Sequence, residues 1–135
     1  MKIIQCWDDG IVSDIPLIKI LKKYNAKATF NLNAGINREE RHVIWNNNGQ
    51  DVIALATHEL NEVYQGFDIA NHSLNHPVLT NMSIEEAKHE ILENKHQLEA
   101  IFRREIKGFS YPFGATNDDI STLVELSGHS YARAV

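Results

Sequence analysis

The chain has 135 residues, of which 43% are hydrophobic and 23% are charged, a composition that suits one globular domain with a single core. Its 18 acidic and 13 basic residues give a formal net charge of −5, and Lys and Arg form no stripe, so we expect no nucleic-acid partner. No stretch is apolar enough to span a bilayer, so no membrane partner is expected. The single cysteine, Cys6, excludes an internal disulfide and is more typical of a small buried hydrophobe than of a metal ligand or nucleophile. Together with the lack of a visible signal peptide, this favours a cytoplasmic location.

The first part of the chain is predicted to alternate between strand and helix. Residues 2–7 form a short apolar run that predicts a buried strand, and the run ends at Asp8-Asp9-Gly10, where glycine suits a tight turn. From Ile15 onwards apolar residues recur with helical spacing, which predicts a helix ending near residues 24–25. Residues 26–32 (AKATFNL) are rich in β-formers and predict a second strand.

The middle of the chain carries weaker signals. Within residues 33–65, the sequence NNNG at 46–49 indicates a turn, and 52–64 is predicted to be helical. A third strand is expected over 67–71 (FDIAN), and His72 follows it directly.

The clearest helix begins at Ser83. Ser83 and Glu86 fit a capping box, and the apolar residues from Ile84 to Phe102 form one stripe at helical spacing. The remaining predicted elements are a fourth strand at 106–111, a helix at 118–126 that ends before Gly128, and a fifth strand that begins in 131–135.

Strands that alternate with helices predict an α/β fold in which parallel strands are joined by helical crossovers. In such folds ligands bind at the carboxyl ends of the strands. Asp8-Asp9, His72 and Pro112-Phe113-Gly114 each follow a predicted strand, so we expect them to converge on one rim.

His72 and His76 are four residues apart in the sequence NHSLNH, so one turn of helix would direct both rings to the same side. Two imidazoles on one side are a common metal-ligand arrangement. Pro77 disfavours helical geometry at His76, so the turn should be short. The alternative is a pair of surface histidines.

Asp8 and Asp9 are adjacent carboxylates at the end of a predicted strand. As an ordinary feature they would mark the start of the first helix, where acidic residues are favoured. As a functional pair they would divide the work, because successive side chains of an extended segment point to opposite sides. One carboxylate could bind a cation together with the two histidines, and the other could act as general base on a water.

The sequence SYPFG at 110–114 is the third segment expected on this rim, and its Pro-aromatic-Gly turn has few polar groups. It could be a simple strand-to-loop turn. It could also form a wall of a cleft and offer a backbone N–H, which Phe113 has and Pro112 lacks.

Together these motifs resemble the polysaccharide deacetylases, the NodB-homology domains of carbohydrate esterase family four. The resemblance rests on Asp8-Asp9-Gly10, His72-Ser73-x-x-His76 and Pro112-Phe113-Gly114 in this order, and it extends over nearly the whole chain. It implies a distorted (β/α) barrel formed by a single domain over residues 1–135. It also implies the removal of N-acetyl groups from an acetylated amino sugar or polysaccharide with a divalent metal, most often zinc.

The resemblance also implies roles for individual residues. Asp8 matches the general base, and the backbone N–H of Phe113 matches a donor to the oxyanion. The matching metal ligands are Asp9, His72 and His76. The residues expected to contact the carbohydrate are Trp7, Pro112, Phe113 and Gly114.

Three departures from the family pattern are visible. Trp7 stands where many relatives have Phe, and Ser110 stands where the family often carries an Arg that orients the base, so the base should be held differently here. No Leu-x-His segment, whose His is the family's general acid, follows Pro112, and we do not assign His129 to that role. With about five strands, the barrel is expected to be incomplete at its C-terminal end. The cause would be truncation, partial order of the protein, or a missing wall supplied by a partner chain, for instance in a homo-oligomer.

Two interpretations of the function stay open. The first is a metal-dependent hydrolase in which Asp8 is the base. The second is a non-catalytic fragment of the same fold that binds metal or glycan, which the missing general acid favours. A phosphatase-like hydrolase with Asp8 as nucleophile is weaker, because no Gly-rich phosphate loop accompanies it.

Overall fold

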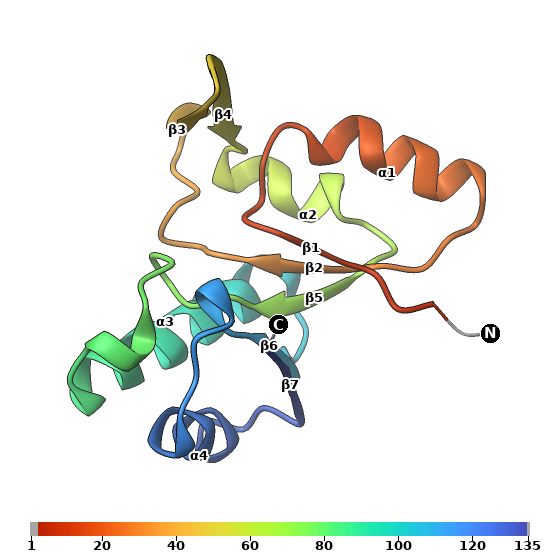
Figure 1. Ribbon diagram of the computed structural model, residues 1–135. Coiled ribbons are helices and arrows are strands. Elements are labelled where there is room, and N and C mark those ends of the chain that lie inside the picture. Colours follow the sequence, from red (N-terminus) through yellow and green to blue (C-terminus); the bar gives the residue numbers. More distant parts are fainter. Residues whose placement is uncertain (1–2, 135) are drawn as a thin grey trace.

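The computed structural model describes residues 3–134, which form a five-stranded parallel sheet, a two-stranded hairpin and the helices around them (Figure 1). The strands of the sheet, in order across it, are β1 (Cys6–Asp8), β2 (Thr29–Leu32), β5 (Asp68–Asn71), β6 (Gly108–Ser110) and β7 (Tyr131–Arg133). All neighbouring pairs in this sheet are parallel. The predicted α/β fold is therefore confirmed.

The helices lie in the connections between the parallel strands, as such connections require. They are α1 (Asp14–Lys23) after β1, α2 (Leu60–Val63) before β5, α3 (Ile84–Phe102) between β5 and β6, and α4 (Asp118–Leu126) between β6 and β7. Single turns of 3-10 helix occur at η1 (Thr57–Glu59), η2 (Leu79–Asn81) and η3 (Pro112–Gly114). In Figure 1, α1 and α2 lie above the sheet and α4 lies below it.

The sheet is curled rather than flat. β1 and β7 are its two outermost strands, with three strands between them, yet Nη2 of Arg133 on β7 lies 3.4 Å from Oδ2 of Asp8 on β1. In a flat sheet, four strand spacings of about 4.8 Å would separate these edges by about 19 Å, which exceeds the reach of the two side chains. The sheet is thus half of a barrel, and its two edges approach each other at the carboxyl ends of the strands.

Two apolar clusters hold the helices on the sheet. The larger one joins β2, α1, α2 and α3, and the most deeply buried of its members include Phe30, Leu32, Leu55, Leu60, Leu98 and Ile106. The smaller one joins α3, β6 and α4 through residues that include Ile91, Phe109, Ile120 and Val124. Each buried aliphatic or aromatic side chain contributes about 1.5–3 kcal/mol, so α3, which has residues in both clusters, is held firmly against the sheet.

The prediction of a helix over 52–64 is wrong for its first part. β3 (His42–Asn47) and β4 (Gln50–Ala54) form an antiparallel hairpin around the predicted turn, and helical structure is confined to residues 57–63. Val52 and Ile53 pair across the hairpin with residues of β3, so cross-strand packing decides their conformation.

The other elements agree with the predictions apart from their ends. The first strand begins only at Cys6, and residues 2 and 135 of the predicted strands lie outside the described residues. The capping box is confirmed, because Ser83 Oγ accepts from Glu86 N at 3.3 Å and Glu86 Oε2 accepts from Ser83 N at 2.9 Å. α4 spans the predicted 118–126.

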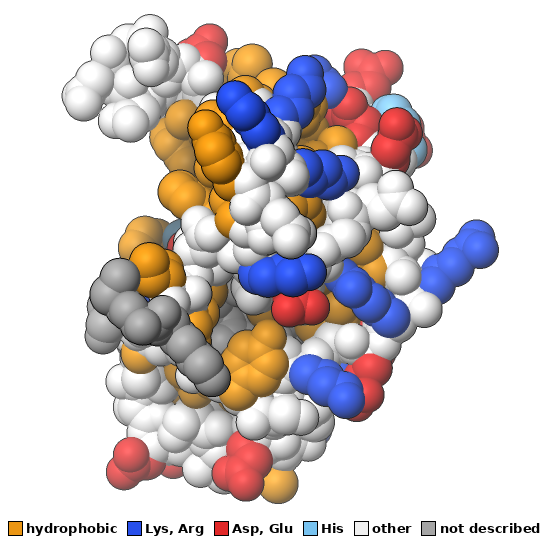
Figure 2. All heavy atoms as spheres, turned by 90° about the vertical axis from the view of Figure 1, so that its right-hand side faces the viewer, with side chains coloured by type: hydrophobic (Ala, Val, Ile, Leu, Met, Phe, Trp, Pro, Cys, Tyr) orange, Lys and Arg blue, Asp and Glu red, His pale blue; other side chains and the backbone are white. Residues whose placement is uncertain are grey.

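Figure 2 shows the face at the amino ends of the strands, where Lys and Arg side chains are scattered over several elements with Asp and Glu between them. At this end of the sheet a hollow of about 320 Å³ is lined by Asp68, Ile69, Arg104, Glu105, Lys107 and Tyr131. None of the described helices combines the length and the apolar character needed to cross a membrane.

Candidate metal centre

Asp9, His72 and His76 meet at the carboxyl ends of β1 and β5. Oδ1 of Asp9 lies 3.8 Å from Nε2 of His72 and 3.6 Å from Nε2 of His76. One potential ligand atom from each residue lies within 4.8 Å of the other two. Two imidazoles and one carboxylate are a donor set that suits zinc, and three protein ligands leave positions for water and substrate.

The environment of Asp9 fits a cation. Its Oδ1 is buried and has no hydrogen-bond partner among the described residues. Burial raises the pKa of Asp9, the two histidines oppose that rise, and the neighbouring Asp8 adds to it. An unpaired buried carboxylate oxygen is costly, and a divalent cation between the three side chains would remove that cost. The residues present therefore fit a divalent metal.

His72 is already in the tautomer that a metal needs. Its Nδ1 lies 2.7 Å from the carbonyl oxygen of Ser110, which can only accept, so Nδ1 carries the proton and Nε2 keeps its lone pair. Burial lowers the pKa of His72, which also favours the neutral ring. Nε2 of this neutral ring faces Asp9.

The two histidines do not lie on a turn of helix, so that part of the prediction is wrong. Residues 72–78 form a loop in which Ser73 has φ +63° and His76 has φ +58°. Pro77 excludes a continuing helix, and the two left-handed residues fold the loop back instead. The rings still come together, with centroids 4.7 Å apart.

Backbone strain is concentrated around this cluster. Seven non-glycine residues among the described ones have positive φ, and four of them belong to the three motifs: Asp9, Ser73, His76 and Phe113. The left-handed region costs an L-residue about 1–2 kcal/mol, so the surrounding structure must hold these residues in place. Such a concentration is typical of a functional site.

α3 holds the loop between the two histidines. Glu90 accepts from the backbone N and the side-chain Nδ2 of Asn75, both at 2.8 Å, and its backbone oxygen accepts from Leu74 N at 3.0 Å. The loop also packs directly on Gly35, where a Cβ would lie 2.4 Å from Asn75 Oδ1. The position of the loop is thus fixed from two sides.

Buried asparagines fix the strand ends below the histidines. Asn94 of α3 donates to Asn71 Oδ1 at 2.6 Å and to Leu32 O at 2.8 Å. Asn33 donates to the carbonyl oxygens of His72 and Ser73. These supporting residues were not predicted, although Glu90 and Asn94 interrupt the apolar stripe of α3 with polar side chains.

Asp8 contacts a different set of partners from Asp9. Its Oδ1 accepts from Asn31 Nδ2 at 2.6 Å, and both of its oxygens lie 3.4–3.5 Å from Nη2 of Arg133. The turn after Asp9 is fixed at Gly10, whose carbonyl accepts from Leu55 N at 3.0 Å. Gly10 has φ +69°, and a Cβ there would lie 3.1 Å from Asn37 Oδ1. The adjacent carboxylates therefore face separate environments.

The third motif reaches the same rim. The ring of Phe113 packs on His76 with centroids 4.6 Å apart and is 65% exposed. Phe113 lies in the first turn of η3, where backbone N–H groups have no partner within the helix. Pro112 is buried, and Gly114 is half-buried. Trp7 is 40% exposed on β1, and strand alternation directs it away from the side of Asp8.

His129 has a structural environment. Its Nδ1 donates to Val124 O at 3.1 Å, its Nε2 lies 3.1 Å from Asn71 Nδ2, and burial lowers its pKa. The ring is therefore neutral and anchors the segment before β7.

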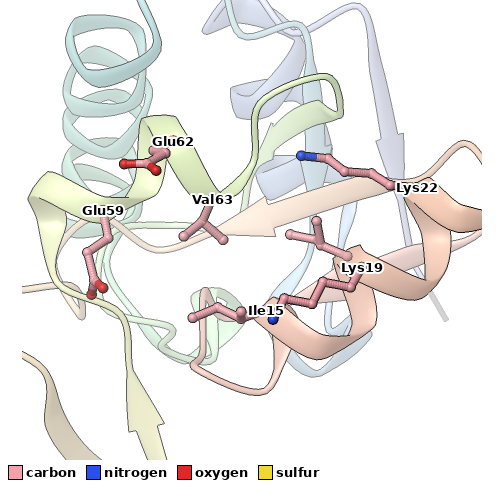
Figure 3. A pocket seen from close by; sticks show the side chains of 7 residues that line it. Ile15, Lys19, Lys22, Glu59, Glu62 and Val63 are labelled. Atoms are coloured by element: carbon pink, nitrogen blue, oxygen red, sulfur yellow. The ribbon is translucent and has the colours of Figure 1, made fainter.

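A separate groove lies between α1 and α2 (Figure 3). It has a volume of about 300 Å³, with Lys19 and Lys22 on the wall from α1 and Glu59 and Glu62 on the wall from η1 and α2. None of its lining residues is among the predicted site residues. The groove is therefore separate from the cluster around Asp9.

Comparison with known proteins gives one family match. A sequence profile described as polysaccharide deacetylase matches residues 1–132. A search of curated proteins finds no match.

Several solved structures share the fold. The deacetylase PplD from Streptococcus pyogenes, in complex with acetate, is 25% identical with a TM-score of 0.75, over 92% of this chain and 51% of that one. A polysaccharide deacetylase from Bacillus cereus is 19% identical with a TM-score of 0.78, over 98% and 39%. A carbohydrate esterase family four pseudoenzyme from Bacillus anthracis is 18% identical with a TM-score of 0.67, over 95% and 42%. The chain thus spans about half of the first of these proteins and less of the other two.

Proposed function

This chain belongs to the polysaccharide deacetylase family, and from that membership we propose that it is a metal-dependent hydrolase that removes N-acetyl groups from an acetylated amino sugar or polysaccharide. The observation that carries the proposal is the meeting of Asp9 Oδ1 with the Nε2 atoms of His72 and His76, while Asp8 stands next to them with its own partners. A site built only to bind a metal has no need of the second carboxylate.

Asp9, His72 and His76 would hold the divalent cation, for which zinc is the best match to the donor set. When bound, it polarises the amide carbonyl and lowers the pKa of a nearby water. Asp8 accepts a proton from the attacking water, whose oxygen bonds to the carbonyl carbon. The backbone N–H of Phe113 donates to the oxyanion that forms. The C–N bond then breaks, and the amine gains a proton that balances the one taken up by Asp8.

Of the four expected carbohydrate contacts, Phe113 and Gly114 are the ones that we propose, whereas Pro112 is buried and Trp7 is directed away from the side of Asp8. The exposed ring of Phe113 supports this assignment, because it lies against His76 at the edge of the site. An exposed aromatic ring offers an apolar face to a sugar while water stays accessible around it.

The second candidate is a non-catalytic module that binds metal or glycan. A pseudoenzyme among the solved relatives supports it, as does the lack of an assigned general acid in this chain. The same cluster around Asp9 would then bind the metal without turnover.

The deciding experiment is acetate release from short N-acetylglucosamine oligomers by the zinc-loaded full chain and by Asp8→Asn. We expect metal-dependent release by the wild type and a loss of about 10²–10⁴-fold in kcat for Asp8→Asn, with zinc binding retained. Asp119→Asn on α4 is the matched control, because it removes an exposed carboxylate far along the chain. Stoichiometric zinc binding without acetate release would rule out the hydrolase and leave the non-catalytic binding module as the function.

A further inference from the structure

Asp8 has one ion-pair partner among the described residues, Arg133. Nη2 of Arg133 lies 3.4 Å from Oδ2 and 3.5 Å from Oδ1 of Asp8, so a single nitrogen faces both oxygens of the carboxylate. The two side chains are 42% and 37% exposed, so the pair lies at the rim where a substrate can reach it.

The backbone of β7 fixes Arg133 on the adjacent strand. Ser110 and Arg133 are register partners in the parallel pair of β6 and β7, and Arg133 O accepts from Tyr111 N at 3.1 Å. Nη2 of Arg133 also donates to Ser110 Oγ at 3.2 Å. The small Ser110 side chain thus leaves room for the guanidinium to pass and gives it a hydrogen bond.

The carboxylate of Asp8 is held from two directions. Asn31 of β2 donates to Oδ1 at 2.6 Å, and Arg133 approaches from β7. Two fixed donors restrict rotation of the carboxylate about its Cβ–Cγ bond, which a single donor would allow. Orientation matters because a general base must present a free lone pair within hydrogen-bond reach of the proton that it accepts.

We propose that Arg133 is a positioning residue that, together with Asn31, orients the Asp8 carboxylate for proton acceptance. This inference rests on the proposed function, because Asp8 is the base only if the site is a hydrolase. Arg133 also joins the two outer strands of the curled sheet. The experiment must therefore distinguish a positioning role from a purely structural one, in which Arg133 only holds these strands together.

The test compares the zinc-loaded full chain with Arg133→Gln and Arg133→Lys, using N-acetylglucosamine oligomers. For Arg133→Gln we expect kcat to fall about tenfold or more while KM stays within about twofold, because the interaction acts on the base. Zinc affinity and Tm should stay at the wild-type values. Arg133→Lys keeps the charge and should regain part of kcat. Lys107→Gln removes an exposed positive charge before β6 and is the matched control.

Chemical rescue gives a second measurement. Guanidinium at about 10–50 mM should raise kcat of Arg133→Ala by about threefold or more, with sodium chloride at the same ionic strength as the control. A loss of Tm or zinc affinity that accounts for the loss of activity would overturn the positioning role in favour of the purely structural one. Wild-type kcat in Arg133→Gln would overturn it and leave the proposed function intact, whereas a wild type without acetate release overturns both.

Discussion

The two sides of the rim are built differently. On the side of His72 and His76, the loop is tied to α3 by Glu90, and the His72 side chain is only 3% exposed. On the side of Asp8, the carboxylate is 37% exposed, and its contact with Arg133 is longer than an ordinary hydrogen bond.

This difference fits the roles that we propose for the two sides, metal binding for one and proton acceptance for the other. Three ligand atoms must stay at fixed separations for a metal to bind, so their supports are short, buried and numerous. A base must meet both water and substrate, so its supports leave one side of it open. Substitutions on the two sides of the rim should therefore affect zinc binding, stability and turnover to different extents.

The largest effect is expected on the histidine side. Replacing His72 or His76 by Ala removes one of three ligands and should weaken zinc binding by about 10³-fold or more, because a two-ligand site no longer encloses the cation. Competition with a chromophoric chelator measures this loss. His89→Ala on the exposed face of α3 is the control and should bind zinc like the wild type. Unchanged zinc affinity in both variants would rule out the proposed centre.

The buried carboxyl group of Asp14 should make the stability of the fold depend on pH. Asp14, at the start of α1, is 4% exposed and accepts from the hydroxyl of Tyr64 at 2.5 Å. Burial raises the pKa of Asp14 from 3.8 to about 6, although the bond from Tyr64 opposes the rise. The folded protein therefore holds this proton to higher pH than the unfolded chain does.

The contribution of Asp14 to the free energy of unfolding is thus complete below pH 3.8 and is lost as the pH rises through about 6. Its size is about 3 kcal/mol at most, from a pKa difference of about two units. Urea unfolding of metal-free protein between pH 4 and 7 should show this decline, and Asp14→Asn should flatten it. An equal slope in both proteins would contradict the prediction.

A smaller effect is expected from the support of the histidine loop. Glu90→Gln replaces one of the two oxygens that accept from Asn75 with a donor, so the loop should loosen and zinc affinity should fall about tenfold. Glu85→Gln, on the exposed face of the same helix, is the control. Titration calorimetry separates the two variants, and equal affinities would show that α3 does not set the ligand geometry.

The smallest effect is expected at Phe113. Phe113→Ala removes the ring that packs on His76 but keeps the backbone N–H, so KM should rise about threefold while kcat changes little. Steady-state acetate release measures both constants. A fall in kcat of about tenfold would contradict this prediction, because it would show that the ring of Phe113, rather than its backbone N–H, supports turnover.

Local signals predicted most elements of the fold. The Ser83–Glu86 capping box and the apolar stripe that follows it predicted α3, and apolar runs predicted the five strands of the sheet. The hairpin was missed because a bulge between Val43 and Trp45 breaks the strand alternation, which leaves Val52 and Ile53 without a readable partner. The conformation of such a segment is decided only by its pairing with another strand.

The candidate site was predictable where a motif is contiguous. The spacing of His72 and His76 and the adjacent Asp8 and Asp9 identified the residues that the structure brings to one rim. The left-handed conformations of Ser73 and His76 were not predictable, because the network below the loop imposes them. Arg133 was missed because its contact with Asp8 exists only once the sheet curls.

The curl of the sheet has a consequence for the order in which the rim assembles. His72 and His76 are joined by a short loop, whereas Asp8 and Arg133 are 125 residues apart. Contacts of long sequence separation form late, since the entropy of closing the intervening chain must be offset first. During refolding we therefore expect the imidazole pair to form first, Asp9 to join it when β1 pairs with β2, and the guanidinium–carboxylate contact to close last. Metal uptake should then precede the recovery of turnover.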